Sequence, residues 1–489
     1  MIAVTQPRYV RVAQDAKLSI AHRTQTIVVF IIMIVIPALA IAGGQAGVLR
    51  VAFPALSVIA GGFLLWRSKP AYVGLVFWLW FLAPFLGRMA DFQGGWTPNS
   101  SVEVAPYLAA ALSGLPLLSS IRTFGSRQAL PYACALVAIL YGLLLGLVSL
   151  PLFDVLRALL NWAVPVLFGL FIYQNRDLYI EFRRVIERSF LFGILLTGAY
   201  GIYQFFALPD WDRLWMLNVQ LNSFGTVEAM KIRAFSTMNA PAIFAAVTMC
   251  GLLLLFNISG KLRLLAAGCG FIGLMLTVSR ASWLGLVAGG IYLILKAEMR
   301  QRVRLVFAAF ACCAFLIGVT QIPAVHDLLL QRMESFSDPG QDVSFAARVV
   351  GHERAFGRLA QEPFGEGLGS TDANHNTEGD DDIIGPHDST VLEFLYSLGW
   401  VGSLVYGVGL VLLAFQMKLA DRNDSFVVSA KAILVGFAAQ CLLNSVMIGV
   451  LGFMVWTFAS MCMAAGDRAD ATGRPTEVEG HRPERLIAI

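Results

Sequence analysis

Long apolar segments recur along almost the whole chain, and they constrain its fold more than any other feature. An apolar run of about 17–25 residues is long enough to cross the hydrocarbon core of a bilayer. Its backbone finds no water there to bond with, so the run must form a helix. The composition agrees, because 57% of the residues are hydrophobic and only 14% are charged, which excludes an ordinary soluble domain. The sequence therefore predicts an all-α polytopic membrane protein with about 12–14 transmembrane helices.

The expected spans follow one another closely, and several are short or merge with a neighbour. They cover about residues 26–44, 51–66, 70–87, 104–120, 130–150, 152–173, 189–207, 239–257, 264–278, 282–296, 305–322, 389–416, 427–446 and 447–465. One long polar loop, residues 323–388, interrupts them. We therefore expect one transmembrane domain over residues 26–465. A short N-terminal segment, 1–25, precedes it, and a disordered tail, 466–489, follows it.

The distribution of Lys and Arg predicts the orientation in the membrane. If the N-terminus is cytoplasmic, the cytoplasmic segments hold 24 of the 36 Lys and Arg residues, and the opposite loops hold ten. The polar prefix before a full-length first span is not the pattern of a cleaved signal peptide. Both termini are therefore expected in the cytoplasm, and loop 323–388 is expected on the outer side.

The long loop has local patterns of its own. Residues Ser344 to Gln361 have the periodicity of an amphipathic helix that lies along the membrane surface. Pro363 ends this pattern, and the glycine-rich stretch from Phe364 to Gly369 follows as a flexible turn. The stretch Thr390–Glu393 then matches a capping box that opens the next membrane helix.

His387 is the first candidate for chemistry, because it directly precedes that helix at the membrane boundary. The positive end of the helix dipole favours the neutral imidazole that a general base needs. Asp388 beside it acts in the opposite sense, towards a higher pKa. The alternative interpretation is an ordinary polar loop residue.

Three arginines on the same outer side are the candidates for binding an anion. Arg280 lies between two apolar spans, where a guanidinium needs an anion or a carboxylate as partner, and its fork fits phosphate oxygens. Arg348 lies in the amphipathic pattern, and Arg233 lies where the chain re-enters the membrane. Each has a plain alternative as a boundary or surface arginine. If they converge with His387, they would form an anion site, for which a lipid diphosphate is the natural ligand at that depth.

No metal or cofactor site is expected. The acidic stretch 372–382 is similar to the first half of a calcium loop, but Thr377 occupies the glycine position and Ile383 the position of the final glutamate. The glycines of 365–369 follow no strand, so they are not a nucleotide-binding fingerprint.

Taken together, these stretches resemble the O-antigen ligase/polymerase family of bacterial envelope glycosyltransferases. The resemblance covers roughly residues 190–465. The matching stretches are Arg233–Pro241, Thr277–Trp283, Arg348 followed by Pro363–Gly369, and His387 followed by the helix that contains Leu398–Gly402.

The resemblance implies an inverting transfer of a glycan from an undecaprenyl diphosphate donor to an acceptor sugar, without nucleotide or metal, at the outer face of the bacterial inner membrane. The acceptor would be lipid A–core or a lipid-linked repeat. His387 would act as the base, Arg280 and Arg348 would neutralise the departing diphosphate, and Arg233 would hold it from the other side.

The chain departs from the family pattern in one place. The family histidine is usually followed by Asn, whereas Asp388 follows His387 here. A His-Asn pair does occur at His375-Asn376, but it lies 24 residues before Gly399 instead of about a dozen. The spacing favours His387 as the base, with His375 as the alternative.

Other classes of function stay open. A lipid-linked sugar flippase or polysaccharide exporter would need polar groups along a path through the membrane, but the charged residues inside the expected spans are few, Arg157 and Lys431. A non-catalytic assembly factor is a third alternative. Within the enzyme class, the sequence distinguishes neither ligase from polymerase nor one sugar from another.

Overall fold

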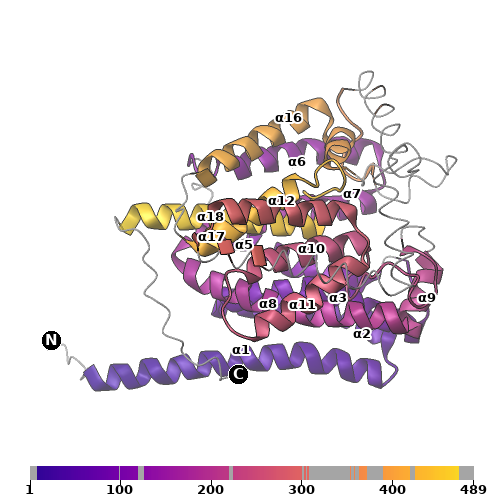
Figure 1. Cartoon of the computed structure of the whole chain (residues 1–489), viewed down its shortest axis with the longest axis horizontal. Coiled ribbons are helices and arrows are strands. Elements are labelled where there is room, and N and C mark those ends of the chain that lie inside the picture. The colour runs from indigo at the N-terminus through magenta and orange to yellow at the C-terminus, as the bar shows by residue number, and fades with distance from the viewer. Residues whose placement is uncertain are drawn as a thin grey trace.

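The computed structural model describes residues 8–98, 100–118, 126–219, 224–299, 363–371, 389–418 and 424–472, together with six isolated positions between 302 and 357. These parts of the chain form helices that are joined mostly by short turns (Figure 1). The helices are α1 (Arg8–Ala42), α2 (Ala46–Arg67), α3 (Lys69–Gly94), η1 (Ser101–Val104), α4 (Ala105–Ala111), α5 (Gly114–Leu118), α6 (Leu130–Ser149), α7 (Leu152–Gln174), η3 (Arg176–Leu178), α8 (Tyr179–Ala207), α9 (Asp210–Val219), α10 (Pro241–Leu255), α11 (Leu262–Leu276), α12 (Arg280–Lys296), α16 (Thr390–Lys418), α17 (Ser425–Ala438) and α18 (Gly449–Thr472).

The prediction of an all-α polytopic membrane protein is confirmed. Within the described residues, eight helices are long and apolar enough to cross a membrane, and further apolar helices are shorter. The expected span at 305–322, the amphipathic pattern at 344–361 and most of the tail lie outside the described residues.

Local sequence signals explain where several helices begin. Proline occupies the first turn of α3, α4, α6 and α10, where its missing N–H needs no partner. Asp424 caps α17 by accepting a hydrogen bond from the Phe426 amide at 2.8 Å. Proline and a capping carboxylate thus begin these helices where the apolar runs predict them.

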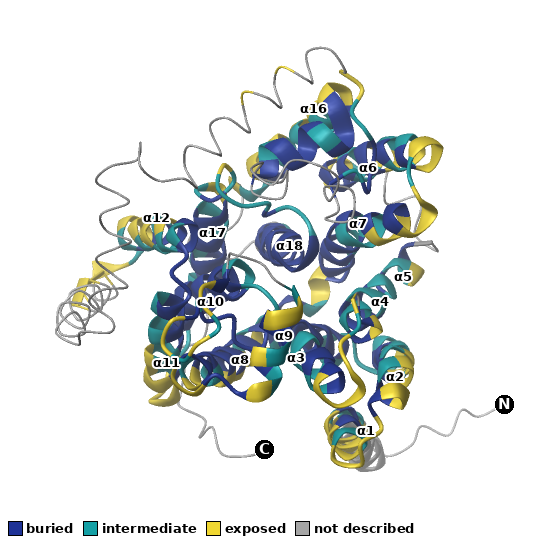
Figure 2. Cartoon of the chain, turned by 90° about the vertical axis from the view of Figure 1, so that its right-hand side faces the viewer, coloured by how far each residue is buried: buried dark blue, intermediate teal, exposed yellow. Residues whose placement is uncertain are grey.

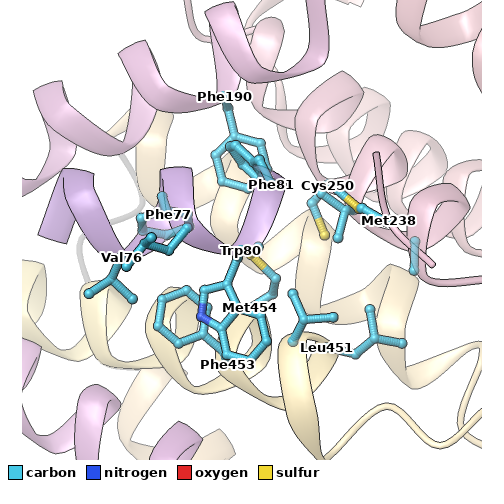
Figure 3. Close-up of a cluster of buried hydrophobic side chains, with 14 of the residues drawn as sticks. Val76, Phe77, Trp80, Phe81, Phe190, Met238, Cys250, Leu451, Phe453 and Met454 are labelled. Atoms are coloured by element: carbon cyan, nitrogen blue, oxygen red, sulfur yellow. The ribbon is translucent and has the colours of Figure 1, made fainter. Parts of the chain in front are cut away.

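Helix α18 forms the centre of the bundle, and the other helices surround it (Figure 2). In its most apolar stretch of 18 residues, 94% of the residues are buried. The helix packs against α7 and α17. Phe453 of α18 meets Phe77 and Trp80 of α3, with ring centroids 5.2 and 5.6 Å apart (Figure 3). This aromatic contact is part of the largest hydrophobic core.

The chain alternates in direction, so the functional candidates gather at one end of the bundle. We call this the long-loop end: it contains α9, residues 224–240, residues 363–371 and the beginnings of α10, α12, α16 and α18 (Figure 1). The opposite end contains the turns around residues 68, 175 and 257.

Candidate anion site at the long-loop end

Two of the predicted arginines lie at one junction of the backbone. The Arg233 guanidinium donates from Nε to the Thr277 carbonyl oxygen at 2.9 Å, and from Nη2 to the Val278 carbonyl oxygen at 3.3 Å. Arg280 is the first residue of α12, two positions after Val278. Both arginine side chains are half-buried. The structure therefore brings Arg233 to the turn that carries Arg280, 47 positions later in the sequence.

The backbone of this junction is strained on both sides. Ser236 and Val278 are non-glycine residues with φ of +52° and +53°. This left-handed region is uncommon for L-residues and especially so for a β-branched one. Such conformations persist only where the surrounding structure holds them, and they cluster at functional sites.

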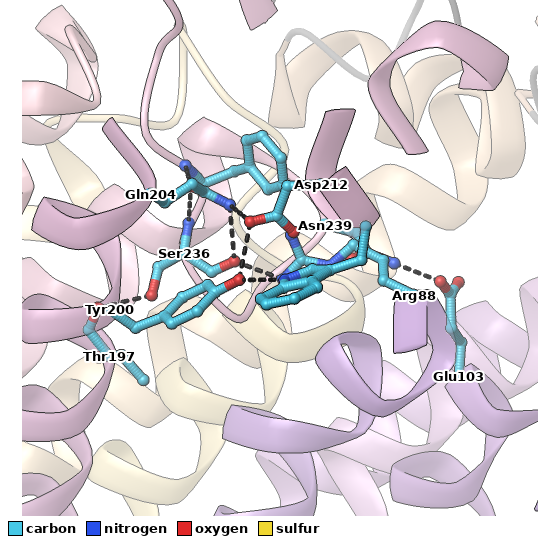
Figure 4. A network of polar contacts seen from close by, with 10 residues as sticks. Arg88, Glu103, Thr197, Tyr200, Gln204, Asp212, Ser236 and Asn239 are labelled. Atoms are coloured by element: carbon cyan, nitrogen blue, oxygen red, sulfur yellow. Dashed lines mark hydrogen bonds and ion pairs between the residues drawn. The ribbon is translucent and has the colours of Figure 1, made fainter. Parts of the chain in front are cut away.

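A buried polar network holds the strained segment on one side (Figure 4). Arg88 and Asp212 form a fully buried ion pair at 2.6 Å, and Arg88 also donates to the Ser236 carbonyl oxygen. The Gln204 side-chain oxygen accepts from the amides of Phe235 and Ser236 at 2.9 and 2.8 Å. These bonds orient the peptide that follows Arg233 by two residues.

Sequence reasoning missed Arg88. The expected span ended at residue 87, which left Arg88 in an outer loop, whereas α3 continues to Gly94. Arg88 and Asp91 are therefore two buried charged residues on α3. They add to Arg157 and Lys431, the charged residues that the sequence placed inside the spans. An arginine within reach of a span end, with an aspartate in the next outer segment, was the available signal.

A chain of side-chain hydrogen bonds joins the beginning of α12 to the beginning of α16. Ser279 Oγ donates to Ser282 Oγ at 3.4 Å, and Ser282 Oγ donates to Gln440 Oε1 at 3.2 Å. Asn444 Nδ2 also donates to Gln440 Oε1, at 3.3 Å, and Thr390 Oγ1 donates to the Asn444 carbonyl oxygen at 2.8 Å. The first turn of α16 is thus tied to the turn that carries Arg280.

His387, Arg348 and the alternative base His375 lie outside the described residues, so their places in the site stay predictions. Both described residues that flank 372–388 are held at the start of α16. Thr371 Oγ1 donates to Glu393 Oε1 at 2.8 Å, and Ser389 Oγ donates to the Cys441 carbonyl oxygen at 3.5 Å. Helix α16 begins at Thr390, as the capping-box pattern predicted, and the side chains of Thr390 and Glu393 bind neighbouring segments.

Residues 363–371, which include the predicted flexible turn Phe364–Gly369, are docked between α6 and α16. Their backbone bonds are Trp400 N to Pro363 O (2.9 Å), Glu366 N to Tyr396 O (2.8 Å) and Leu368 N to Gly142 O (2.9 Å). Gly365 and Gly367 have φ of +81° and +94°, and a Cβ at Gly367 would overlap the backbone of Gly146. The prediction of flexibility was wrong because these glycines permit close backbone packing, not only turning.

Gly399 completes this contact from the other side. Helix α16 is broken there, at φ +59° and ψ −167°, and a Cβ on Gly399 would overlap the Phe364 backbone. The break lets Trp400 N reach the Pro363 carbonyl oxygen. The two motif stretches 363–369 and 398–402 therefore lock together and fix the end of the loop against the bundle.

The arrangement suits an anion. Helices α10, α12, α16 and α18 all begin at the long-loop end, so the positive ends of their dipoles point towards it. Two half-buried guanidinium groups add their charge at the Arg233–Arg280 junction. In the described part of the chain, no group of His, Cys, Asp and Glu residues has the arrangement of a metal site.

Comparison with known proteins identifies the same region. Residues 265–407 match a family model described as O-antigen ligase; this range contains Arg280 and the interlocked stretches 363–369 and 398–402. No curated protein matches the chain. The match supports glycosyltransferase-type activity in general. Over residues 265–407, the chain is therefore similar to the O-antigen ligase family.

Proposed function

We propose that this protein transfers a glycan from an undecaprenyl-diphosphate-linked donor to an acceptor sugar at the outer face of the bacterial inner membrane. The long-loop end is then the periplasmic end, and both termini are cytoplasmic. The acceptor is lipid A–core for a ligase or a lipid-linked repeat for a polymerase. The reaction is inverting and, as the family resemblance implies, uses no metal.

The chemistry follows from the charges that the reaction creates. His387 takes the proton from the acceptor hydroxyl, whose oxygen attacks the anomeric carbon on the face opposite the diphosphate. The bond from that carbon to the diphosphate oxygen breaks, and its electron pair leaves with the diphosphate. Arg280, Arg348 and Arg233 bind that growing negative charge through their guanidinium forks.

The contact of Arg233 with the carbonyls of Thr277 and Val278 is the observation that carries this proposal. It joins two segments that the resemblance singled out separately, and it does so where four helix N-termini add positive potential. A flippase or exporter is the second candidate. The buried charges Arg88 and Asp212 pair with each other, which favours a fixed site over a polar path.

Substitution of Arg280 tests the proposal. The protein is reconstituted in liposomes with lipid-linked glycan and acceptor, both extracted from a strain that lacks this gene. Arg280→Lys keeps the charge but loses the planar fork, so we expect kcat to fall roughly 100-fold or more. The measurement is the rate at which acceptor gains glycan, read on gels.

Arg213→Lys is the matched control, since Arg213 is exposed on α9 at the same end. It should transfer glycan at the wild-type rate. If Arg280→Lys transferred glycan at the wild-type rate, Arg280 would not belong to the site. If the wild-type protein moved lipid-linked glycan across the bilayer without attaching it to the acceptor, the protein would be a flippase and not an enzyme.

A further inference from the structure

A second polar cluster lies beside the arginine junction, and the proposed mechanism does not use it. Glu103, in the 3-10 turn η1, accepts a hydrogen bond from Asn239 Nδ2 (Figure 4). Asn239 belongs to the same segment as Arg233 and lies two positions before Pro241, where α10 begins. The carboxylate is thus attached to the segment that positions the proposed diphosphate site.

The charges around Glu103 are mixed. Burial raises the pKa of the Glu103 carboxyl to about 7; Arg157 of α7 and Arg88 of α3 oppose this rise, as does the Asn239 hydrogen bond, whereas Asp91 of α3 adds to it. Glu103 lies outside the eight helices that are long enough to span a membrane. Near neutral pH, the group therefore exists in both its charged and its neutral form.

Several polar atoms near Glu103 have no hydrogen-bond partner within the described part of the chain. They are Asn239 Oδ1 and Ser100 Oγ; Thr237 Oγ1, two positions before Asn239 in the chain, also has none. Ser100 and Thr237 are 4% and 3% exposed. Buried polar atoms in native proteins nearly always have a partner, so these atoms indicate a polar ligand or water at this place.

Polar side chains from other helices extend the cluster towards the centre of the bundle. Tyr107 follows Glu103 by one helical turn, and Asn161 follows Arg157 by one turn. The Tyr107 hydroxyl and Asn161 Oδ1 both lie beside Gly449, at the start of α18: a Cβ built there would be 3.2 and 3.6 Å from them. A hydroxyl of α4 and an amide of α7 thus meet at the start of α18, each one turn along the chain from Glu103 or Arg157.

We propose that Glu103 and Asn239 bind hydroxyl groups of a sugar ring in one of the two glycans that the protein joins. This proposal rests on the proposed function and names a part of its substrate site. The negative Glu103 repels a diphosphate, whereas a carboxylate beside an amide offers both acceptors and donors to a neutral, hydroxyl-rich ring. The ring belongs to the donor or to the acceptor, and the experiment distinguishes the two.

The simpler interpretation is a structural tie between η1 and the 233–241 segment. Two variants separate the interpretations. Glu103→Gln keeps an oxygen that accepts from Asn239, so a structural tie survives, but the charge that binds hydroxyls is lost. Glu103→Ala removes both. Glu228→Gln is the control, because Glu228 is an exposed glutamate at the same end of the molecule.

The experiment measures initial rates in liposomes while the concentrations of extracted lipid-linked donor and extracted acceptor are varied separately. We expect Glu103→Gln to raise the KM of one substrate about tenfold, as expected for the loss of one charge-assisted hydrogen bond. The kcat and the thermal unfolding midpoint stay unchanged, and Glu228→Gln behaves as wild type. The substrate whose KM rises identifies the glycan that carries the ring.

The pH dependence gives an independent readout. The charged carboxylate is the better acceptor of hydroxyl hydrogen bonds, so in the wild type this KM rises as the pH falls below about 7. The charged groups around Glu103 are Arg157, Arg88 and Asp91. Glu103→Gln has no group to titrate at this position, so its KM should not change over the same range.

Two results overturn the proposal. Unchanged KM values in Glu103→Gln, with a lower unfolding midpoint in Glu103→Ala alone, would make Glu103 a structural tie. If the wild type transfers no glycan, the proposed function is wrong. The sugar-binding role of Glu103 is then tested by glycan binding alone. Native mass spectrometry of the detergent-solubilised protein with each extract would still show weaker glycan binding in Glu103→Gln, and equal binding would exclude the subsite.

Discussion

Arg233 contacts the backbone of the turn that carries Arg280. Its guanidinium donates two hydrogen bonds, to the carbonyl oxygens of Thr277 and Val278. These bonds hold the guanidinium at the turn that precedes α12. A guanidinium at this turn adds positive charge beside the start of α12, which is the charge that the proposed diphosphate site needs.

The identity of the general base is the residue-scale prediction. We expect His387→Ala to lower kcat roughly 100- to 10,000-fold, because the acceptor hydroxyl loses the group that takes its proton. His375→Ala should leave kcat close to that of the wild type. The measurement is the transfer rate in liposomes with extracted donor and acceptor. The reverse pattern, loss with His375→Ala alone, would make His375 the base.

At the element scale, the stretch 363–371 and the broken helix α16 act as one unit. Backbone bonds from Pro363, Glu366 and Leu368 reach α16 and α6. The unit holds Thr371 against Glu393 in the first turn of α16. Residues 363–371 are thus fixed to the beginning of α16 at the long-loop end.

Gly399 is the position where this unit can be tested. Gly399→Ala should destabilise the protein by more than about 2 kcal/mol, because only glycine adopts this backbone conformation without strain. Gly407→Ala on the same helix is the control: nothing lies within 4 Å of a Cβ there, and alanine is the better helix former. The measurement is the thermal unfolding midpoint in detergent. Equal midpoints would mean that the docking contributes nothing to stability.

The helices could be predicted from the sequence, because apolar runs leave the backbone no alternative in a bilayer. The start of α16 was also predictable, from Thr390 and its neighbours. The docking of Gly367 on Gly146 was not, since a glycine stretch that turns freely and one that packs closely look alike in sequence. The Arg88–Asp212 pair was missed because its members are 124 positions apart.

At the scale of the whole molecule, the bundle has two ends with different characters. The long-loop end holds strained backbone, buried charges and helix N-termini. At the opposite end, Tyr179 and Arg183 bind the capping Asp424 at 2.6 and 3.0 Å, which ties α8 to α17. A site at one end and ionic ties at the other suit a fixed enzyme that acts at one membrane surface.

The orientation of the bundle can be tested with single cysteines. Asn218→Cys on α9 should react in intact cells with a maleimide that does not cross membranes, since the long-loop end is proposed to face the periplasm. Ser259→Cys, in the exposed turn after α10, should react only after the cells are opened. The wild type, with its own cysteines, sets the background. If only Ser259→Cys were labelled in intact cells, the orientation in the membrane would be the opposite of the one proposed.

The length of lipid-linked glycan in a strain that lacks this gene tests the central claim most directly. We predict that transfer stops, so that glycan stays on its lipid carrier. Long carrier-linked chains without surface attachment would identify a ligase, and single carrier-linked repeats would identify a polymerase. Normal lipid-linked glycan together with full-length glycan at the surface would contradict the glycosyltransferase account.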